Sequence, residues 1–402
     1  MSDLLLVVEA LQRLRAAVPH ATPGETIPIT QSVGRVLIEP LISTRTQPPF
    51  PASAMDGYAV RAADLVPGQP LKLVGESAAG RGYRAALQSG EAIRIFTGAP
   101  VPEGADTILI QENARVDTDH VFPTQTEVQG RYLRPAGADF TTGQGFFIAG
   151  HRLRPKDMAL AASLGMATIT VHRRPRVAVL ATGDELVHPG KRPGPDQIIA
   201  ANHLSVMALA EKAGAEASFL GIARDDLADL ARHIDAAREN KADILVTMGG
   251  ASVGDHDLVQ KALALAGMDL SFWRIAMRPG KPLMFGTLGA MRVLGLPGNP
   301  ASSVVCAHLF LKPLIRAYLG QPEDDAPQIG RLGSDLPAND QRQDYLRAKL
   351  TLAEDGMAVL TPFTAQDSAL THVLAQADAL VIRSPHAGAA KAGEACRYML
   401  LD

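Results

Sequence analysis

The stretch of residues 242–257, ADILVTMGGASVGDHD, decides the fold, because it changes character three times in sixteen residues. Its first six residues are apolar and partly β-branched, as in a buried strand. Three glycines and a serine follow, and this composition lets backbone N–H groups turn around an anion. Asp255 and Asp257 come next, and residues 258–266 have helical spacing. α/β proteins hold phosphate-bearing ligands at such a sequence of strand, glycine loop and helix start.

The two carboxylates beside this loop would repel a phosphate unless a cation lies between them. We therefore interpret Asp257 as a metal ligand. The alternative is that Asp257 only caps the following helix. The loop residues expected to contact the ligand are Gly249, Gly250, Ser252 and Gly254.

Strand and helix patterns alternate around this stretch, which predicts a parallel sheet covered on both faces. Helices are expected at 202–214, 225–239, 258–266 and 300–319, and strands at 176–183, 217–223, 242–247, 270–276, 282–287 and 291–296. The fold class is therefore multidomain α/β, with a three-layer α/β domain over residues 175–320.

Acidic residues follow three of the predicted strands. TGDEL (182–186) carries Glu185 after the first strand, and ARDD (223–226) carries Asp225 after the second. Asp257 follows the third strand. The carboxyl ends of parallel strands share one edge, so these acids are expected to converge there. Such a cluster favours Mg²⁺, with Glu185 and Asp257 as the predicted ligands. The alternative for Asp225 is a helix cap.

Two proline-stiffened loops complete this edge. MRPGKP (277–282) carries Arg278 and Lys281, which we interpret as an oxyanion site, although solvated turn charge is the alternative. LPGNP (296–300) places Pro297 and Pro300 around a glycine and an asparagine.

Outside this domain the chain has three further parts. Helical spacing over residues 4–18 and again over 150–171 suggests two helices that pack together. Short β-type runs at 71–74, 92–96 and 107–111 indicate a strand-rich lobe, and a small β domain follows the polar linker 321–328. The predicted domains are 1–42 with 146–174 (helical), 43–145 (lobe), 175–320 (α/β) and 327–402 (C-terminal β).

Composition excludes several classes of protein. A net charge of −3 with interspersed signs points to neither nucleic acid nor an anionic membrane. Cys306 and Cys396 form no CxxC pair, which suits a reducing, cytoplasmic location. No segment is apolar enough to span a bilayer.

Two motifs in the lobe carry further candidates. SAMDGYAV places Asp56 in a glycine turn, and FTGAPVPEGAD places Thr97 at a strand end. Taken alone, each is better explained as a plain turn.

A serine hydrolase is a less favoured alternative. Residues 250–254 match GxSxG between a strand and a helix, with Ser252 as the nucleophile. Asp269 with His308 or His372 would complete a triad. However, no HGGG-type oxyanion loop precedes the motif, and two nearby carboxylates would oppose an oxyanion.

Taken in order, SAMDGYAV, FTGAPVPEGAD, TGDEL, GIARDD, MGGASVGDHD, MRPGKP and LPGNP resemble the motifs of the molybdopterin molybdotransferases, the MoeA and gephyrin E-domain family. The resemblance covers essentially the whole chain. It implies four parts, the last a β-barrel-like domain, and a homodimer with the site at the subunit interface. The implied reaction is Mg²⁺-dependent insertion of molybdate into adenylylated molybdopterin, with release of AMP. Implied partners are a molybdopterin adenylyltransferase and apo-molybdoenzymes.

Carried over by motif, the resemblance implies functional residues at Asp56, Thr97, Asp139, Glu185, Asp225, Asp257, Arg278, Lys281, Pro297 and Pro300. This chain departs from the family at Arg278, where lysine is usual, and at Ala200-Ala201, where polar residues are usual. A non-catalytic scaffold is the second class of function, since one branch of the family anchors receptors. The full set of charged loops argues against it.

Overall fold

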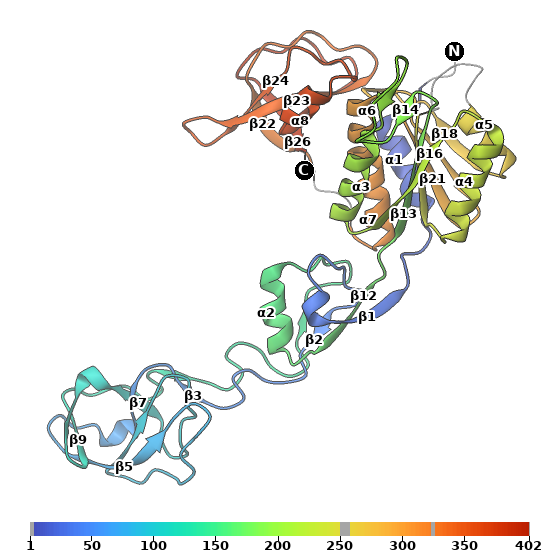
Figure 1. Cartoon of the computed structure of the whole chain (residues 1–402). Helices are drawn as coiled ribbons and strands as arrows, with labels where there is room; N and C mark the ends of the chain where they lie inside the picture. The colour runs from blue at the N-terminus through green and yellow to red at the C-terminus, as the bar shows by residue number, and fades with distance from the viewer. Residues whose placement is uncertain (1–3, 250–257, 323–325, 402) are drawn as a thin grey trace.

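The computed structural model describes residues 4–249, 258–322 and 326–401. The molecule is elongated, with the strand-rich lobe at one end and the α/β domain and C-terminal β domain at the other (Figure 1). A stem built from both chain segments that flank the lobe lies between them. The predicted domain boundaries within this arrangement stay predictions.

The α/β domain is built on a six-stranded sheet. Its order is β16 (Glu216–Ala223), β13 (Arg176–Thr182), β17 (Ile244–Met248), β21 (Met291–Leu296), β20 (Met284–Leu288) and β18 (Asp269–Trp273). The first four strands are parallel, as predicted, and β20 runs antiparallel to both of its neighbours, β21 and β18. Every residue of β17 is buried, because helices cover both faces of the sheet.

Helices on the two faces complete a three-layer domain, which confirms the predicted fold class. One face packs against α1 (Val7–Ala16), α3 (Asn202–Ala213), α6 (Pro300–Cys306) and α7 (Lys312–Tyr318). The other packs against α4 (Leu227–Glu239) and α5 (Leu258–Leu265). The predicted helix 300–319 is interrupted by a π-helical turn, η4 (Ala307–Leu311). Pro313 follows it, and a proline that cannot donate an N–H favours such a break.

The stem differs from the sequence prediction in two ways. Only α2 (Pro155–Ser163) of residues 150–171 is an α-helix, and β12 (Thr168–His172) is a strand paired with β1 (Gly24–Pro28). Ile169 and Val171 are buried in alternation, so the β-branched run overrides the helical spacing. The expected packing of the two helices is also wrong, because α1 buries Leu14 in the α/β core.

The lobe is a six-stranded sheet of order β7 (Thr107–Ile110), β4 (Gly57–Val60), β6 (Glu91–Ile95), β5 (Leu71–Ser77), β9 (His120–Pro123) and β8 (Ala114–Asp117). All three β-type runs predicted there are strands. Two short antiparallel pairs connect the lobe to the stem, β3 (Ala52–Ser53) with β10 (Leu133–Arg134) and β2 (Leu41–Ile42) with β11 (Gly145–Phe146). Single 3₁₀ turns are η1 (Ile29–Gln31), η2 (Ala62–Asp64) and η3 (Gln111–Asn113).

The C-terminal domain is a closed five-stranded barrel. Its strands are β23 (Gln343–Leu352), β24 (Ala358–Pro362), β22 (Gln328–Leu332), β26 (Ala395–Leu400) and β25 (Ala379–Arg383), and β25 pairs back to β23. The short strand β19 (Met277–Arg278) joins the barrel to the α/β domain by pairing with β23. Helix α8 (Thr371–Gln376) lies beside α6. A small ribbon, β14 (Leu186–Val187) with β15 (Ile198–Ile199), precedes α3.

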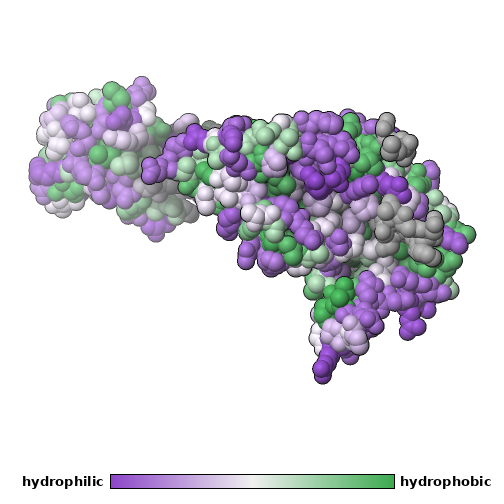
Figure 2. Space-filling model, turned by 90° about the horizontal axis from the view of Figure 1, so that it is seen from above, coloured by the Kyte–Doolittle hydropathy of each residue, from purple (hydrophilic) through white to green (hydrophobic). Residues whose placement is uncertain are grey.

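The outer surface mixes polar and apolar residues. On the face shown in Figure 2, hydrophilic side chains are interspersed with small apolar groups. Within the described ranges, no helix has both the length and the apolar character needed to cross a membrane.

Candidate functional site

The carboxyl ends of the four parallel strands meet at one edge of the α/β sheet. Backbone N–H groups link the loops that leave them: Gly183 donates to Ala223 O at 3.1 Å, and Gly249 donates to Leu296 O at 3.2 Å. The Thr182 hydroxyl donates to the backbone oxygen of Met248 at 3.3 Å. The loops that carry the predicted site residues therefore begin side by side.

Close backbone approach at this edge requires glycine. Gly249 has φ +99°, and a Cβ there would lie 2.6 Å from the backbone oxygen of Thr182. A Cβ at Gly298 would lie 3.6 Å from the Cα of Gly249. The start of the glycine loop and the LPGNP loop are thus in contact, as a shared ligand site would need.

Two of the three predicted acidic loops are neighbours. The backbone N–H of Asp225 donates to Asp184 Oδ1 at 3.3 Å, and the Glu185 carboxylate lies against Gly183. Glu185 and Asp225 are both exposed. The alternative reading of Asp225 as a helix cap is wrong, because Asp226 accepts the N–H groups at the start of α4 at 2.9 and 3.0 Å.

The loop between Pro297 and Pro300 is fixed from both sides. Asn202, at the start of α3, donates through Nδ2 to Gly298 O at 2.7 Å. Asn299 Nδ2 donates to the Ser368 hydroxyl of the C-terminal domain at 2.9 Å. Pro300 then begins α6. Ser368 was missed by the sequence analysis, since nothing in its local pattern links it to this edge.

Arg278 is paired with carboxylates, although about half of its side chain remains exposed, 48%. Its guanidinium forms a two-point contact with the buried carboxylate of Asp344, including Nε to Oδ1 at 2.9 Å, and Asp340 lies 3.7 Å from Nη1. The hydrogen bond to Asp344 raises the pKa of Arg278. Arg278 is thus an exposed turn charge that is paired with carboxylates, and this pairing weakens the oxyanion interpretation. Lys281, in the same turn, is exposed.

Arg347, on strand β23 of the barrel, is a further cation that the sequence analysis missed. Its side chain is fully buried, and none of its three guanidinium nitrogens has a hydrogen-bond partner among the described residues. Burial lowers the pKa of Arg347. The side chain of Gln366 accepts a hydrogen bond from the backbone N–H of Arg347 and donates one to the backbone oxygen of Arg347. These bonds hold the segment that carries Ser368 against Arg347. The available signal was an arginine two residues after Tyr345, because alternate strand residues share a face and Tyr345 packs in the α/β core.

The lobe brings two other predicted residues together. Asp56 Oδ1 accepts the backbone N–H of Thr97 at 2.7 Å and its hydroxyl at 2.8 Å. The Thr97 backbone N–H, then its hydroxyl, lower the pKa of the exposed Asp56 carboxyl. Asp139 lines an adjoining groove of about 650 Å³ together with Arg45, Phe50, Gly98 and Arg134.

These two groups of residues do not meet within one chain, because the lobe and the α/β domain occupy opposite ends of the molecule (Figure 1). Gly250, Ser252, Gly254 and Asp257 lie outside the described residues, so the metal pair and the GxSxG serine stay predictions. Among residues 4–249, 258–322 and 326–401, no group of three or more His, Cys, Asp or Glu side chains is placed to hold a metal.

Comparison with known proteins adds an independent result. Residues 5–165 match the MoeA N-terminal region (domain I and II), residues 178–317 a probable molybdopterin binding domain, and residues 330–401 the MoeA C-terminal region (domain IV). The chain is 33% identical to a molybdopterin molybdenumtransferase of Haemophilus influenzae over 97% of both chains. It is 37% identical to one from Nostoc, covering 82% of this chain and 78% of that protein. A crystal structure of a Pyrococcus horikoshii MoeA protein of molybdopterin biosynthesis aligns with a TM-score of 0.84 and 28% identity over 99% of both chains.

Proposed function

Because the chain belongs to the molybdopterin molybdenumtransferase (MoeA) family, an enzyme family of molybdenum cofactor biosynthesis, we propose that it inserts molybdate into adenylylated molybdopterin and releases AMP. One observation carries this proposal. The sheet edge joins the acidic loops of Glu185 and Asp225, the start of the glycine loop and the LPGNP loop. A phosphate-bearing ligand fits such a strand-end crevice.

Each part of the edge has a separate task in this proposal. Backbone N–H groups after Gly249 bind the pyrophosphate of the substrate, and the loop between Pro297 and Pro300 orients the pterin. Oxygen ligands from Glu185 and Asp257 suit Mg²⁺, which prefers one or two carboxylates together with phosphate oxygens. When bound, the metal would offset the negative charge of the pyrophosphate as it is cleaved.

The molybdate oxyanion requires cations that are not already neutralised. Lys281 is exposed in the MRPGKP turn, and the guanidinium of Arg347 lacks a hydrogen-bond partner within the described residues. A buried cation without a hydrogen bond is costly even with the charge of Asp367 nearby, and an anion that accepts its N–H groups would relieve that cost. We therefore place molybdate near Lys281 and Arg347, with Arg278 as the residue that fixes the turn through Asp344.

Asp56 and Thr97 enter this proposal through a second subunit. The elongated chain separates them from their own sheet edge, so a homodimer in which each lobe reaches the partner's edge would complete two sites. A molybdopterin adenylyltransferase as supplier of substrate, apo-molybdoenzymes as acceptors and a cytoplasmic location belong to the same proposal.

Reconstitution of a cofactor-free molybdoenzyme tests the function. The purified protein, Mg²⁺, molybdate and adenylylated molybdopterin should together activate the acceptor and release AMP in equal amounts. Omission of molybdate is the control, and AMP release that does not depend on molybdate would contradict insertion.

The two alternative functions predict different outcomes, one in AMP release and one in ester hydrolysis. A scaffold of this family would bind the pterin without releasing AMP. A serine hydrolase would lose ester hydrolysis entirely in Ser252→Ala, whereas the insertion proposal predicts at most weaker substrate binding in that variant.

A further inference from the structure

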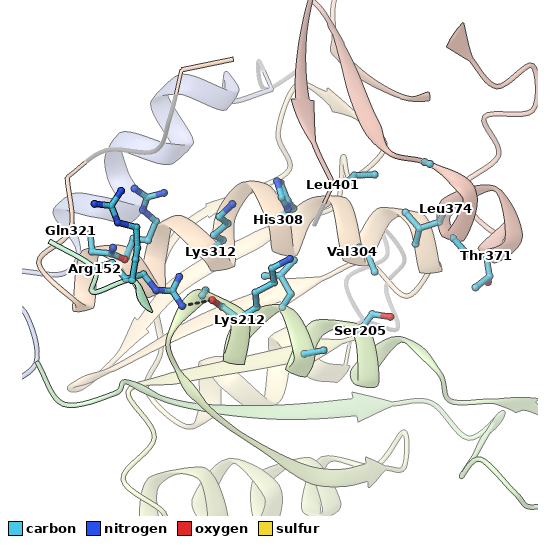
Figure 3. A pocket seen from close by; sticks show the side chains of 17 residues that line it. Arg152, Ser205, Lys212, Val304, His308, Lys312, Gln321, Thr371, Leu374 and Leu401 are labelled. Atoms are coloured by element: carbon cyan, nitrogen blue, oxygen red, sulfur yellow. Dashed lines mark hydrogen bonds between the residues drawn. The ribbon is translucent and has the colours of Figure 1, made fainter. Parts of the chain in front are cut away.

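A pocket of about 1010 Å³ lies between α3, α7, α8 and the stem (Figure 3). Its lining includes a histidine and five Arg and Lys side chains, and each of them already interacts with another group of the protein. One such contact, from Arg152 Nη2 to the backbone oxygen of Lys212 at 2.7 Å, joins the stem to α3. Because none of these basic side chains is free, their charge does not indicate a ligand.

Arg94, on β6 of the lobe, differs because its contacts surround one predicted site residue, Asp56. Its Nη1 donates to the backbone oxygen of Gly57, the residue after Asp56, at 3.2 Å. Its Nη2 donates to the side-chain oxygen of Gln111 at 2.8 Å. Gln111 in turn donates its backbone N–H to the backbone oxygen of Asp56 at 3.2 Å. Arg94 thus bridges two groups that adjoin the main chain of Asp56.

Two aromatic rings fix the guanidinium of Arg94. It lies 5.1 Å from the ring centre of Tyr58 and 4.9 Å from that of Phe96, within the range of cation–π attraction. Tyr58 is buried and is the direct cross-strand partner of Arg94 between β4 and β6, and Phe96 precedes Thr97. An arginine held by two rings and two hydrogen bonds has little freedom, so it can fix the geometry of the groups that it binds.

The carboxylate of Asp56 has one engaged oxygen and one open oxygen. Oδ1 accepts both hydrogen bonds of Thr97, at 2.7 and 2.8 Å, whereas no group among the described residues donates to Oδ2. The bonds from Thr97 and, as the smallest cause, the charge of Arg94 lower the pKa of this exposed carboxyl. Oδ2 is therefore an anionic acceptor that a ligand can reach.

We propose that Arg94 is a positioning residue, which holds the main chain of Asp56 so that Oδ2 is presented to the substrate. This inference rests on the proposed function, in which Asp56 completes the sheet edge of a partner subunit. Arg94 is half-buried, and both of its terminal nitrogens already donate within the lobe, so it acts through Asp56 and not on the substrate. A guanidinium suits this task because its donors form a rigid fork, which the single ammonium of a lysine does not provide.

Arg94→Lys separates position from charge, because it keeps the positive charge and loses the fork. The pKa of the Asp56 carboxyl, measured by carbon NMR on the full chain, should rise toward the ordinary value of an aspartate as the bonds from Thr97 loosen. The kcat/KM of molybdate-dependent AMP release should fall about 10- to 100-fold, as for a reacting group displaced by about 1 Å. Arg115→Lys is the matched control, since Arg115 lies 4.1 Å from the ring centre of Phe122 in the same lobe, and it should change neither quantity.

A second variant tests the same bridge from its other end. Gln111→Leu leaves Arg94 in place but removes the acceptor of its Nη2, and because Gln111 is exposed the fold should tolerate the change. It should raise the pKa of Asp56 less than Arg94→Lys does and lower kcat/KM about 3- to 10-fold.

The two measurements fail separately. An Asp56 pKa that stays at the parent value in both variants would overturn the positioning role, and a raised pKa with full AMP release would overturn its link to the substrate. A parent protein that releases no AMP with molybdate would instead contradict the proposed function, while the pKa still decides whether Arg94 positions Asp56.

Discussion

The sheet edge of the α/β domain and the turn of the lobe position their acidic residues by different means. At the sheet edge, topology brings Glu185 and Asp225 together, because parallel strands end on one side. In the lobe, two hydrogen bonds from a single residue, Thr97, hold Asp56. The edge therefore depends on the order and direction of strands in a large sheet, whereas the lobe pair depends on the backbone N–H and the hydroxyl of one residue. Substitutions should affect the two regions in different ways.

The largest expected effect tests whether the two regions act together. Asp56→Asn and Lys281→Ala homodimers should each be inactive in molybdate insertion. Mixed under conditions of subunit exchange, they should recover about a quarter of the parent activity, since half of the dimers carry one intact site. Activity is measured as molybdate-dependent AMP release.

Subunit exchange is the control for this mixture, and two affinity tags on the two variants would demonstrate it. Proven exchange without recovered activity would show that the lobe and the sheet edge do not share a site.

The second effect concerns the backbone of the edge. Gly249→Ala should lower the free energy of unfolding by about 2 to 4 kcal/mol, because it adds a left-handed residue and a clash with Thr182 O. Gly267→Ala is the matched control, with φ +89° and no atom within 4 Å of the added Cβ. It should cost only about 1 kcal/mol. Equal losses in urea unfolding would show that close approach at Gly249 is unimportant.

The sequence predicted the α/β domain better than the stem and the barrel. Alternating strands and helices over residues 175–320 predicted the parallel sheet and its edge, because their period and length leave few other arrangements. The stem was harder, since Thr168–His172 has both helical spacing and β-branched residues, and only its pairing with β1 decides between them. Ser368 and Arg347 were missed because the barrel that brings them to the edge is distant in sequence.

A third prediction concerns the link between the α/β domain and the barrel. Arg278→Ala should lower the free energy of unfolding by about 1 to 3 kcal/mol, because the buried Asp344 carboxylate would lose its charged partner. Arg278→Lys should lose less, since an ammonium keeps the charge but not the two-point contact. Arg331→Ala is the control, because its bond to Asp355 is exposed. An Arg278→Ala protein as stable as the control would show that the link contributes little.

The smallest effect is expected in the lobe. Thr97→Val keeps the shape and the backbone N–H but removes the hydroxyl that donates to Asp56. The pKa of Asp56 should therefore rise toward the ordinary value of an aspartate and stay below it, because the backbone N–H of Thr97 is the larger cause of the lowering. A lowered carboxyl pKa stabilises the fold fully above the unfolded pKa, and this contribution is lost as the pH falls through the folded pKa. The difference in stability between Thr97→Val and the parent should thus be constant near neutral pH and disappear in acid, as the pH falls through the lowered pKa of Asp56 in the folded parent. Carbon NMR of the Asp56 carboxyl measures the pKa directly, and Thr26→Val in the stem is the control. A pKa that does not move would mean that the hydroxyl has no influence on Asp56, and the pair would then be an ordinary turn.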